Sequence, residues 1–418
     1  MTKAEQLNAT LRAQAPAAYA MLSNLGRELA FPDGVPMQSY EAAGCELRAT
    51  IGQLTDGHGK ALAPAALSEH LQGITDEEAF LYAHVAGLPR LRDLWGARLA
   101  EQAAGVVFSR PVVTAGISHA LNTAAELFAD SDTDVLLPVP HWGNYRMVFG
   151  LRRGSPIHSW SFFDGQGRLG LDSLATALGR VQRKAILVLN FPSNPTGYSP
   201  LLEEVEPLIQ LILAHPHPLV VLLDDAYHGW VYEDNALRDS LFWELTRRGD
   251  PERLLTVKAD GATKELLYFG GRVGFLSFGV GGAAAEALID KSMASIRGTV
   301  STVSSVSQAL ARAALEDPAL PQQIAERKAL ITGRYLALRR ALEQSADVLH
   351  PLPFNSGFFA VARLNANFDA HTVRRQLIAE QSVGLIAVPE VNGLRIAFCS
   401  IREEEIPELF ARVRRVLG

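Results

Sequence analysis

The sequence predicts an α/β protein, in which a mostly parallel sheet flanked by helices forms a large domain and the N- and C-terminal segments form a smaller α+β domain. Short apolar runs without polar alternation recur through the middle of the chain, as expected for strands that are covered on both faces. Helical patterns lie between several of these runs, and such alternation is typical of a parallel sheet. After about Gly282 the pattern changes to long helical stretches and two further strand-like runs.

The strands of the large domain are expected where leucine and β-branched residues cluster. The predicted strands are residues 111–114, 135–137, 185–189, 219–223, 254–257 and 273–276. Residues 117–128 carry apolar side chains at helical spacing, and residues 201–214 form a second helical pattern. Ligands of open α/β sheets bind beyond the carboxyl ends of the strands, so we expect the functional residues just after these runs.

The smaller domain is expected from the two ends of the chain. A helical stretch over 283–344 is interrupted near 298–307 and at two prolines, and strand-like runs follow at 357–361 and 394–398 before a terminal helix from about residue 403. We therefore predict an N-terminal segment of the small domain at 1–50, a large domain at 51–295, and the C-terminal part of the small domain at 296–418.

Composition and charge exclude several classes of protein. The 418 residues carry 39 basic and 45 acidic side chains, a net charge of −6, which does not fit a nucleic-acid-binding surface. Apolar residues make up 48% of the chain, enough for a sizeable core. The two cysteines, Cys45 and Cys399, lie far apart and argue against a disulfide framework or a cysteine-rich metal site.

The N-terminal residues do not resemble a targeting or membrane segment. Charged side chains interrupt the apolar residues from Met1 to Ala30, and no run of about 18 apolar residues occurs in the chain. We expect a soluble, cytoplasmic protein with no membrane contact.

Two groups of polar residues follow predicted strands and could carry chemistry. Asp224 and Asp225 come directly after the apolar run that ends at Leu223, where a buried carboxylate needs a cation or a donor. The alternative is a helix cap or a structural ion pair. Lys264 follows the next run; in a partly desolvated pocket its amine could lose a proton and form a Schiff base with a carbonyl, whereas an ordinary lysine is a solvated surface charge.

Two loops are unusual in composition. Residues 190–197, Asn-Phe-Pro-Ser-Asn-Pro-Thr-Gly, combine two prolines and two asparagines in a loop that cannot be helical. Residues 114–120 lie at a strand-to-helix junction, where amides beside Gly116 could hold a phosphate. The same segment loosely resembles a nucleophile elbow, which leaves a serine hydrolase at Ser118 as an alternative.

A glycine-rich segment at residues 279–284 resembles a degraded dinucleotide-binding fingerprint. Its sixth position is alanine, which favours a structural turn. A dinucleotide enzyme is thus a further alternative, but it uses neither the asparagine–proline loop nor Lys264.

Four motifs in this order resemble the class I/II aminotransferases, which are fold-type I pyridoxal-phosphate enzymes similar to aspartate aminotransferase. Asn194-Pro195-Thr196-Gly197 matches the family's Asn-Pro-x-Gly loop, and Asp224-Asp225-Ala226-Tyr227 its Asp-x-Ala-Tyr strand end. Lys264 with Arg272 resembles the Schiff-base lysine and phosphate-binding arginine, and Gly393-Leu394-Arg395-Ile396 the segment that binds the substrate α-carboxylate. The resemblance extends from about residue 51 to residue 398.

The resemblance implies a role for each matched residue. Lys264 would hold pyridoxal 5′-phosphate and move the substrate proton, Asp224 would pair with the ring nitrogen, and Tyr227 and Asn194 would bind the ring oxygen. Arg395 would bind the substrate carboxylate through a bidentate fork. The cofactor phosphate would be held by Gly116, Ile117, Ser118, Thr263 and Arg272.

Further matches are with aspartate aminotransferase in particular. They imply that Trp142 stacks on the cofactor ring, although a core position is the alternative, and that Gly52 passes close to the substrate carboxylate. Tyr82 would reach the phosphate in a partner subunit, which implies a homodimer with shared sites. Arg297 would reach a side-chain carboxylate across the dimer, or it is a solvated residue that ends a helix. Gly261 departs from the pattern, because many relatives carry a phosphate-binding serine there.

The resemblance therefore implies an aminotransferase that moves an amino group between an L-amino acid and a 2-oxo acid by a ping-pong route. Glutamate and 2-oxoglutarate are the expected donor pair, with a dicarboxylic or aromatic second substrate. A pyridoxal-phosphate C–S β-lyase is the alternative within the same fold. Relatives that are transcription regulators carry a fused DNA-binding module, for which the roughly 50 preceding residues show no basic helix-turn-helix.

Overall fold

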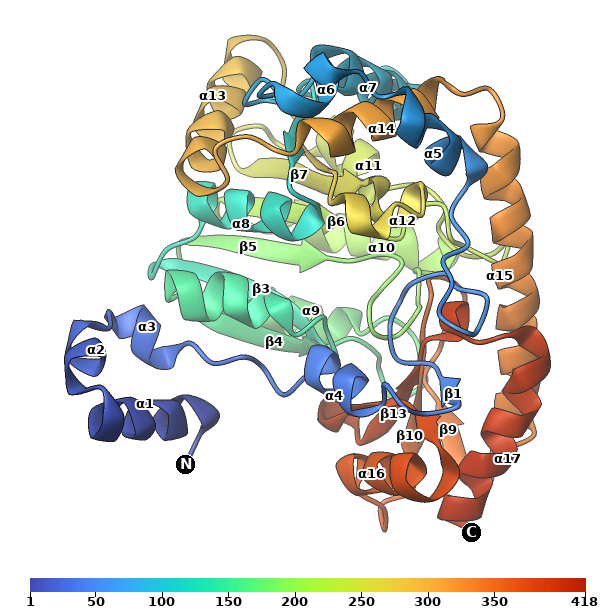
Figure 1. The fold of residues 1–418 in the computed structure, drawn as a ribbon. Helices are drawn as coiled ribbons and strands as arrows, with labels where there is room; N and C mark the ends of the chain where they lie inside the picture. The colour runs from blue at the N-terminus through green and yellow to red at the C-terminus, as the bar shows by residue number, and fades with distance from the viewer.

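A seven-stranded sheet forms the middle of the structure, a computed structural model that describes residues 1–418 (Figure 1). Five neighbouring strands are parallel, and β8 runs antiparallel to both of its neighbours. The mostly parallel sheet that the sequence predicts is thus confirmed. In spatial order the strands are β2 (Val112–Thr114), β8 (Gly274–Phe278), β7 (Leu254–Gly261), β6 (Leu219–Asp224), β5 (Lys184–Leu189), β3 (Thr133–Val139) and β4 (Ile157–Ser161).

The strand order changes direction between β3 and β5. From β3 the chain moves outward to β4, whereas from β5 it moves the opposite way to β6 and β7. Loops after two such strands diverge and leave a crevice at their carboxyl ends, where ligands of open α/β sheets bind.

Alternate residues of the central strands belong to two different cores. In β5, Ile186 and Val188 join one core, while Leu187 and Leu189 join the other. Helix α8 (Ile117–Phe128) packs on the first face of the sheet. The second core contains residues of α7 (Pro89–Ala103), α9 (Leu171–Leu178), α10 (Leu202–Leu213) and α11 (Leu241–Arg248). Cover on both faces explains why the strands are apolar without alternation.

A second, four-stranded antiparallel sheet is formed near the C-terminus. It contains, in spatial order, β12 (Ile386–Val388), β13 (Gly393–Ile396), β10 (Ala360–Leu364) and β9 (Leu349–Pro351). Helices α16 (Ala370–Gln381) and α17 (Ile406–Leu417) pack beside it, and the long α15 (Leu320–Glu343) runs from the large sheet to this end of the molecule (Figure 1).

The two helices before α15 lie beside the large sheet. Helix α13 (Gly282–Thr299) packs on α8, and α14 (Ser305–Glu316) packs on α5 (Ala65–Ser68), α6 (Asp76–Phe80) and α7. The domain boundary at residue 295 stays a prediction.

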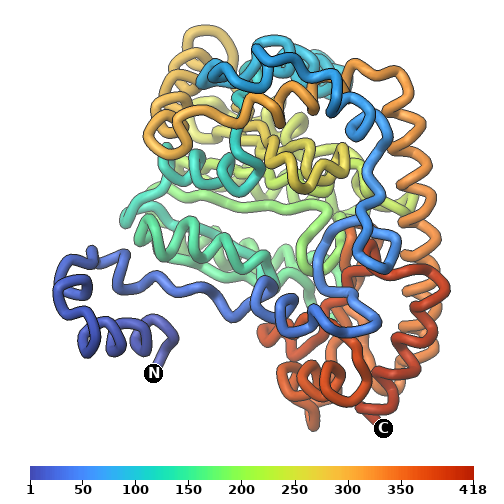
Figure 2. Tube along the Cα trace, in the orientation of Figure 1, coloured from blue at the N-terminus to red at the C-terminus, as the bar shows by residue number.

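The N-terminal segment has two parts. Helices α1 (Lys3–Gln14), α2 (Pro16–Met21) and α3 (Asn24–Glu28) contain no buried residue and project from the body, as Figure 2 shows at the blue end of the tube. Beyond them, α4 (Val35–Glu41) contacts β12, and β1 (Leu47–Arg48) pairs with β11 (Val383–Gly384). Residues 35–48 therefore pack with the C-terminal elements. None of the helices combines the length and apolar character needed to cross a membrane.

Candidate active site

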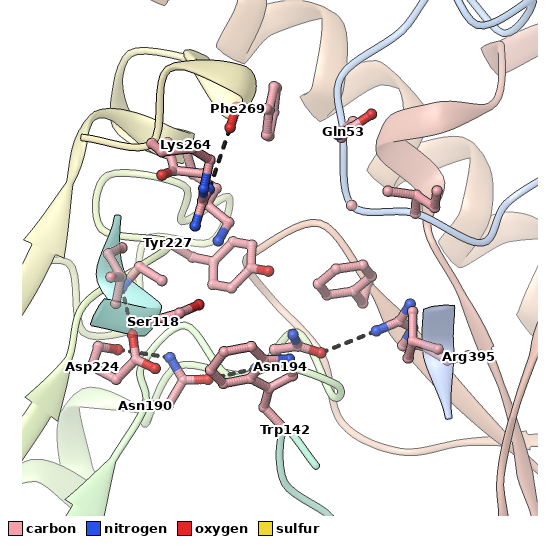
Figure 3. Close-up of a pocket in the computed structure, with 18 residues that line it drawn as sticks. Gln53, Ser118, Trp142, Asn190, Asn194, Asp224, Tyr227, Lys264, Phe269 and Arg395 are labelled. Atoms are coloured by element: carbon pink, nitrogen blue, oxygen red, sulfur yellow. Dashed lines mark hydrogen bonds between the residues drawn. The ribbon is translucent and has the colours of Figure 1, made fainter. Parts of the chain in front are cut away.

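A cavity of about 230 Å³ lies where the carboxyl ends of the large-sheet strands face the C-terminal sheet (Figure 3). Lys264 and Asp224 lie on one side of it and Arg395 on the other. Eleven residues named from the sequence line this cavity: Gly52, Ile117, Ser118, Trp142, Asn194, Asp224, Tyr227, Thr263, Lys264, Arg272 and Arg395. The structure thus brings together residues that are up to 343 positions apart in the sequence, from Gly52 to Arg395.

Asp224 is the last residue of β6, and its carboxylate is held from two directions. The hydroxyl of Tyr145 donates to Oδ2 at 2.5 Å, and the backbone N–H of Ala226 donates to Oδ1 at 3.2 Å. The Asn190 amide donates to the Asp224 carbonyl at 2.7 Å and fixes the strand end. Burial raises the pKa of Asp224 to about 6, although the Tyr145 hydrogen bond and the charge of Lys264 oppose this. The carboxyl is therefore ionised above about pH 6.

Lys264 projects into the same cavity from α12 (Ala262–Glu265), a single helical turn after β7. Its ammonium nitrogen lies 4.9 Å from the centre of the Tyr227 ring. Burial lowers the pKa of Lys264 to about 8; Asp224 opposes this shift and Arg272 adds to it. A substantial fraction of the amine is thus neutral near pH 8, which is the form that attacks carbonyl carbon.

An anion-binding corner lies at the start of α8. Gly116 has φ +77°, and a Cβ there would lie 2.4 Å from Nη2 of Arg272, so the guanidinium packs directly over this glycine. Helix α8 begins here with Gly116 as its N-cap, so its first amides and the positive end of its dipole lie at this corner. The buried hydroxyl of Thr263 has no hydrogen-bond partner within the chain. This set of donors suits a phosphate group.

Arg395, on β13, supplies the cation on the opposite side of the cavity. Its Nη1 donates to Oδ1 of Asn194 at 3.2 Å, and Nη2 donates to the carbonyl of Thr50 at 2.6 Å. The guanidinium lies 4.2 Å from the centre of the Phe359 ring. Burial lowers the pKa of Arg395 to about 10, so it remains a cation at neutral pH. The buried Nε is without a partner, and a planar cation held in this way suits a carboxylate.

Gly52 and Trp142 shape the walls of the cavity. A Cβ on Gly52 would lie 2.4 Å from Cζ of Phe359, so the absence of a side chain lets that ring approach. Trp142 is half-buried at the cavity wall, and its ring meets Tyr145 edge-on at 5.5 Å. It is therefore not wholly a core residue.

Apart from Gly116, which directly precedes the lining residue Ile117, two residues named from the sequence do not line the cavity of this chain. Tyr82 is 91% exposed. Arg297, at the end of α13, is exposed and donates to the hydroxyl of Ser301. Their assignment to a partner subunit's site stays a prediction.

The features behind the two alternative enzymes have other contacts here. His119, next to Ser118, accepts a hydrogen bond from the Ala115 N–H and contacts the hydroxyl of Thr299, so it does not serve Ser118. A Cβ on Gly279 would lie 2.0 Å from Oγ1 of Thr256, which gives this glycine a packing role.

Several residues of the site were given no role from the sequence. Tyr145, Asn190 and Phe359 support the reactive groups, and Val35, Gln53 and Phe269 line the cavity. Tyr145 and Asn190 lie within segments whose position after a strand is visible in the sequence. Val35 and Gln53 carry no such signal, because their place depends on how the N-terminal segment folds across the cavity.

Taken together, the fold and the site define an α/β protein with a buried lysine and carboxylate at the strand ends and a buried arginine across the cavity on a second sheet. The family model for aminotransferase class I and II matches residues 48–413. The chain belongs to the aminotransferase class I and II family, in which pyridoxal phosphate is the general cofactor.

Comparison with individual proteins agrees with this assignment. The chain is 32% identical to an aspartate aminotransferase of Rhizobium meliloti over 49% of this chain and 47% of the relative. It is 27% identical to a probable aspartate/prephenate aminotransferase of Rickettsia felis over 82% of this chain and 85% of that one. The match therefore spans about half the length of the first relative and most of the second.

Solved structures share the fold. An aminotransferase of Anaerococcus prevotii superposes with a TM-score of 0.83 at 20% identity, over 95% of this chain and 99% of that one. The aspartate aminotransferase of Thermus thermophilus with maleate gives a TM-score of 0.76, also at 20% identity, over 95% of this chain and 99% of that one.

The residues present fit pyridoxal phosphate. Three observations agree: an anion corner with the unpartnered Thr263 hydroxyl, a carboxylate at Asp224, and a lysine with a lowered pKa on the same side of the cavity. A phosphate, a protonated ring nitrogen and an aldehyde are the three groups that these residues are suited to bind.

Proposed function

We propose that the protein is a pyridoxal-phosphate-dependent aminotransferase that moves an amino group between an L-amino acid and a 2-oxo acid by a ping-pong route. The observation that carries the proposal is the meeting of Lys264 and Asp224 with Arg395 across one cavity. A catalyst of amino-group transfer needs an amine of low pKa, an anion for the cofactor ring and a cation for the substrate carboxylate. Family membership supports the same reading.

The cofactor would be held by residues at the strand ends. Arg272, Thr263 and the Gly116–Ser118 amides would bind its phosphate, and Asp224 would keep its ring nitrogen protonated. Trp142 would cover one face of the ring, and Tyr227 and Asn194 would bind the ring oxygen. When bound, pyridoxal phosphate supplies an aldehyde carbon that accepts the amino group and a ring that withdraws electrons from the substrate Cα.

The side chains of this protein would then bind the substrate and move its protons. Arg395 would bind the α-carboxylate and orient the Cα–H bond toward Lys264. Gly52 would leave room beside that carboxylate. Lys264 would hold the cofactor aldehyde until the substrate amine takes its place, which frees the lysine amine. That neutral amine would take the Cα proton and return it at the former aldehyde carbon, which is a general acid–base step. Its lowered pKa suits this exchange near neutral pH.

Covalent labelling tests the proposal. Borohydride reduction of the cofactor-loaded protein, followed by peptide mapping, should attach the cofactor to Nζ of Lys264. Lys264→Ala should remain unlabelled and lose turnover, while Lys184→Ala, at a half-exposed lysine paired with Asp132, should behave as wild type. A label on another lysine, or an active Lys264→Ala variant, would overturn the assignment.

A C–S β-lyase would use the same cofactor set. The discriminating measurement is the product: release of pyruvate and ammonia without a 2-oxo acid acceptor marks the lyase, and dependence on the acceptor marks the aminotransferase.

For the substrates, we propose glutamate and 2-oxoglutarate as the donor pair, with a dicarboxylic or aromatic second substrate. Arg297 of a partner subunit would bind the side-chain carboxylate. Arg297→Ala should then raise KM for dicarboxylates about tenfold or more, the equivalent of one charged hydrogen bond, and leave aromatic substrates unchanged. Equal losses for both classes would remove Arg297 from this role.

A further inference from the structure

Directly behind the candidate site, on the opposite face of the sheet, lies a buried cation that the proposed reaction does not use. Lys258 of β7 is 0% exposed and forms ion pairs with Asp225 and, at 3.4 Å, with Asp260. Burial lowers the pKa of Lys258, but the two carboxylates outweigh this and raise it above its ordinary value. The ammonium therefore stays charged across the working range of pH.

The partners of Lys258 are close neighbours in sequence of the two reactive residues. Asp225 follows Asp224 directly, and because successive strand residues point to opposite faces, one carboxylate enters the cavity while the other meets Lys258. Ser240 donates a second hydrogen bond to the Asp225 carboxylate at 2.6 Å. Contacts of Lys258 and Ser240 with Asp225 therefore fix the end of β6 on the face of the sheet opposite the cavity.

The short helix that carries Lys264 is held by the same group of charges. Trp95 donates to Asp260 at 3.1 Å, and Arg98 lies 3.1 Å from Glu265, the residue after Lys264. Burial raises the pKa of Glu265 to about 7, against the attraction of Arg98. A helix of four residues has little rigidity of its own, so its orientation comes from these contacts.

Stability alone does not account for this arrangement. Two well-packed apolar side chains in place of a buried ion pair are often as stable or more stable, because desolvation offsets the attraction between the charges. An ion pair instead adds geometric specificity, because it determines which atoms of the two segments are in contact. Here the atoms that meet join β6, which ends in Asp224, to β7, which leads to Lys264.

We propose that Lys258 is a positioning residue which, through Asp225 and Asp260, fixes the spacing between the Asp224 carboxylate and the Lys264 amine. The inference rests on the proposed function for its kinetic consequence. Its geometric consequence is independent of that function, because the mutual distance of the two groups also sets the pKa of Lys264 in the apoprotein.

The test uses the double variant Lys258→Met/Asp225→Asn, which removes both charges and so avoids a buried unpaired carboxylate. If Lys264 and Asp224 move apart, the anion raises the lysine pKa less. The pH midpoint for acylation of Lys264 in the apoprotein, followed by mass spectrometry, should then fall by about half a unit or more. In the loaded enzyme we expect at least a tenfold loss of kcat with KM within threefold, and at least tenfold weaker binding of pyridoxal phosphate.

Two further variants keep the result interpretable. Asp225→Asn alone leaves Lys258 paired with Asp260, so this variant should fold. Its acylation midpoint, kcat and cofactor affinity should change in the same directions as in the double variant, but by less. Arg414→Met/Asp347→Asn removes an ion pair between α17 and the turn before β9, neither of which lines the cavity, and should leave all three readouts at the wild-type value.

A folded double variant with an unchanged acylation midpoint, cofactor affinity and kcat would overturn the inference, since Lys258 would then serve charge balance alone. A wild-type protein that does not bind pyridoxal phosphate would instead contradict the proposed function. The acylation midpoint would still decide the positioning role in that case.

Discussion

The hydroxyl of Tyr145 donates a hydrogen bond to Oδ2 of Asp224 across 2.5 Å, from a residue 79 positions earlier in the chain. Tyr145 is buried, and its ring also meets Trp142 edge-on. One side chain thus supports both the carboxylate proposed to pair with the cofactor ring and the indole proposed to cover that ring. The protonation of Asp224 is therefore expected to depend on Tyr145.

Replacing Tyr145 with phenylalanine should raise the pKa of Asp224 further above its present value of about 6, because a bond that favours the ionised form is lost. Loss of a hydrogen bond to a charged group should shift the pKa of that group by about one unit or more. Infrared difference spectra of the apoprotein, with Asp224→Asn to assign the carboxyl band, measure the midpoint. Tyr198→Phe removes a hydroxyl bound to buried Glu204 at 2.6 Å, away from the cavity, and should not move it.

Gly116→Ala should weaken cofactor binding about tenfold or more. The new Cβ would meet the Arg272 guanidinium at 2.4 Å, and a φ of +77° with extended ψ is costly for alanine, by about 1–3 kcal/mol. Equilibrium titration of the apoprotein with pyridoxal phosphate and urea unfolding measure the two effects. Gly73→Ala is the matched control, since its Cβ would meet no atom within 4 Å. Unchanged affinity in Gly116→Ala would place the phosphate elsewhere.

The amine of Lys264 should titrate near pH 8 in the apoprotein. Acylating reagents attack neutral amines, so the labelling rate of Lys264 should rise through about pH 8, whereas Lys184 has a raised pKa and should respond at higher pH. Asp224→Asn removes the anion that raises the pKa of Lys264 and should move its midpoint downward. An upward movement, or a midpoint near 10.5 in the wild type, would contradict the burial described for this group.

Mixing two defective variants should produce one intact active site if Tyr82 serves a partner subunit. In a heterodimer of Lys264→Ala with Tyr82→Ala, one site would carry both defects and the other neither. The intact site should then show the wild-type KM for the cofactor at about half of the wild-type kcat per dimer. If Tyr82 acts within its own chain, the single site with a lysine would lack Tyr82 and keep the weakened affinity of the Tyr82→Ala homodimer.

The parts of the site that lie next to strands could be predicted from sequence. Asp224, Lys264 and the loop at 190–197 each follow an apolar run, and parallel strands bring their carboxyl ends to one edge of the sheet. The strand that precedes Lys264, predicted at 254–257, continues to Gly261 in the structure. The sequence did not predict this extension because it contains Lys258 and Asp260. Charged residues indicate a solvent-exposed segment unless their buried ion-pair partners are known.

Other parts depend on contacts between distant segments. Phe359 reaches the cavity because Gly52, 307 positions earlier, has no side chain to exclude it. The edge strand β4 was not predicted, since Ile157–Ser161 is short and carries polar residues. The projecting helices α1–α3 were likewise indistinguishable from the rest of the first 50 residues, because their separation from the body is a tertiary property.

The opposite orientation of Asp224 and Asp225 has a consequence for how this sequence can change. Deleting or inserting a single residue within β6 would exchange the two carboxylates, turning Asp225 toward the cavity and Asp224 toward Lys258. Composition and hydrophobicity would barely change. The carboxylate that faces the cavity would, however, be displaced by one residue along the strand and would no longer lie opposite the Tyr145 hydroxyl. Length variation in this protein is therefore expected in the surface loops and not in this strand.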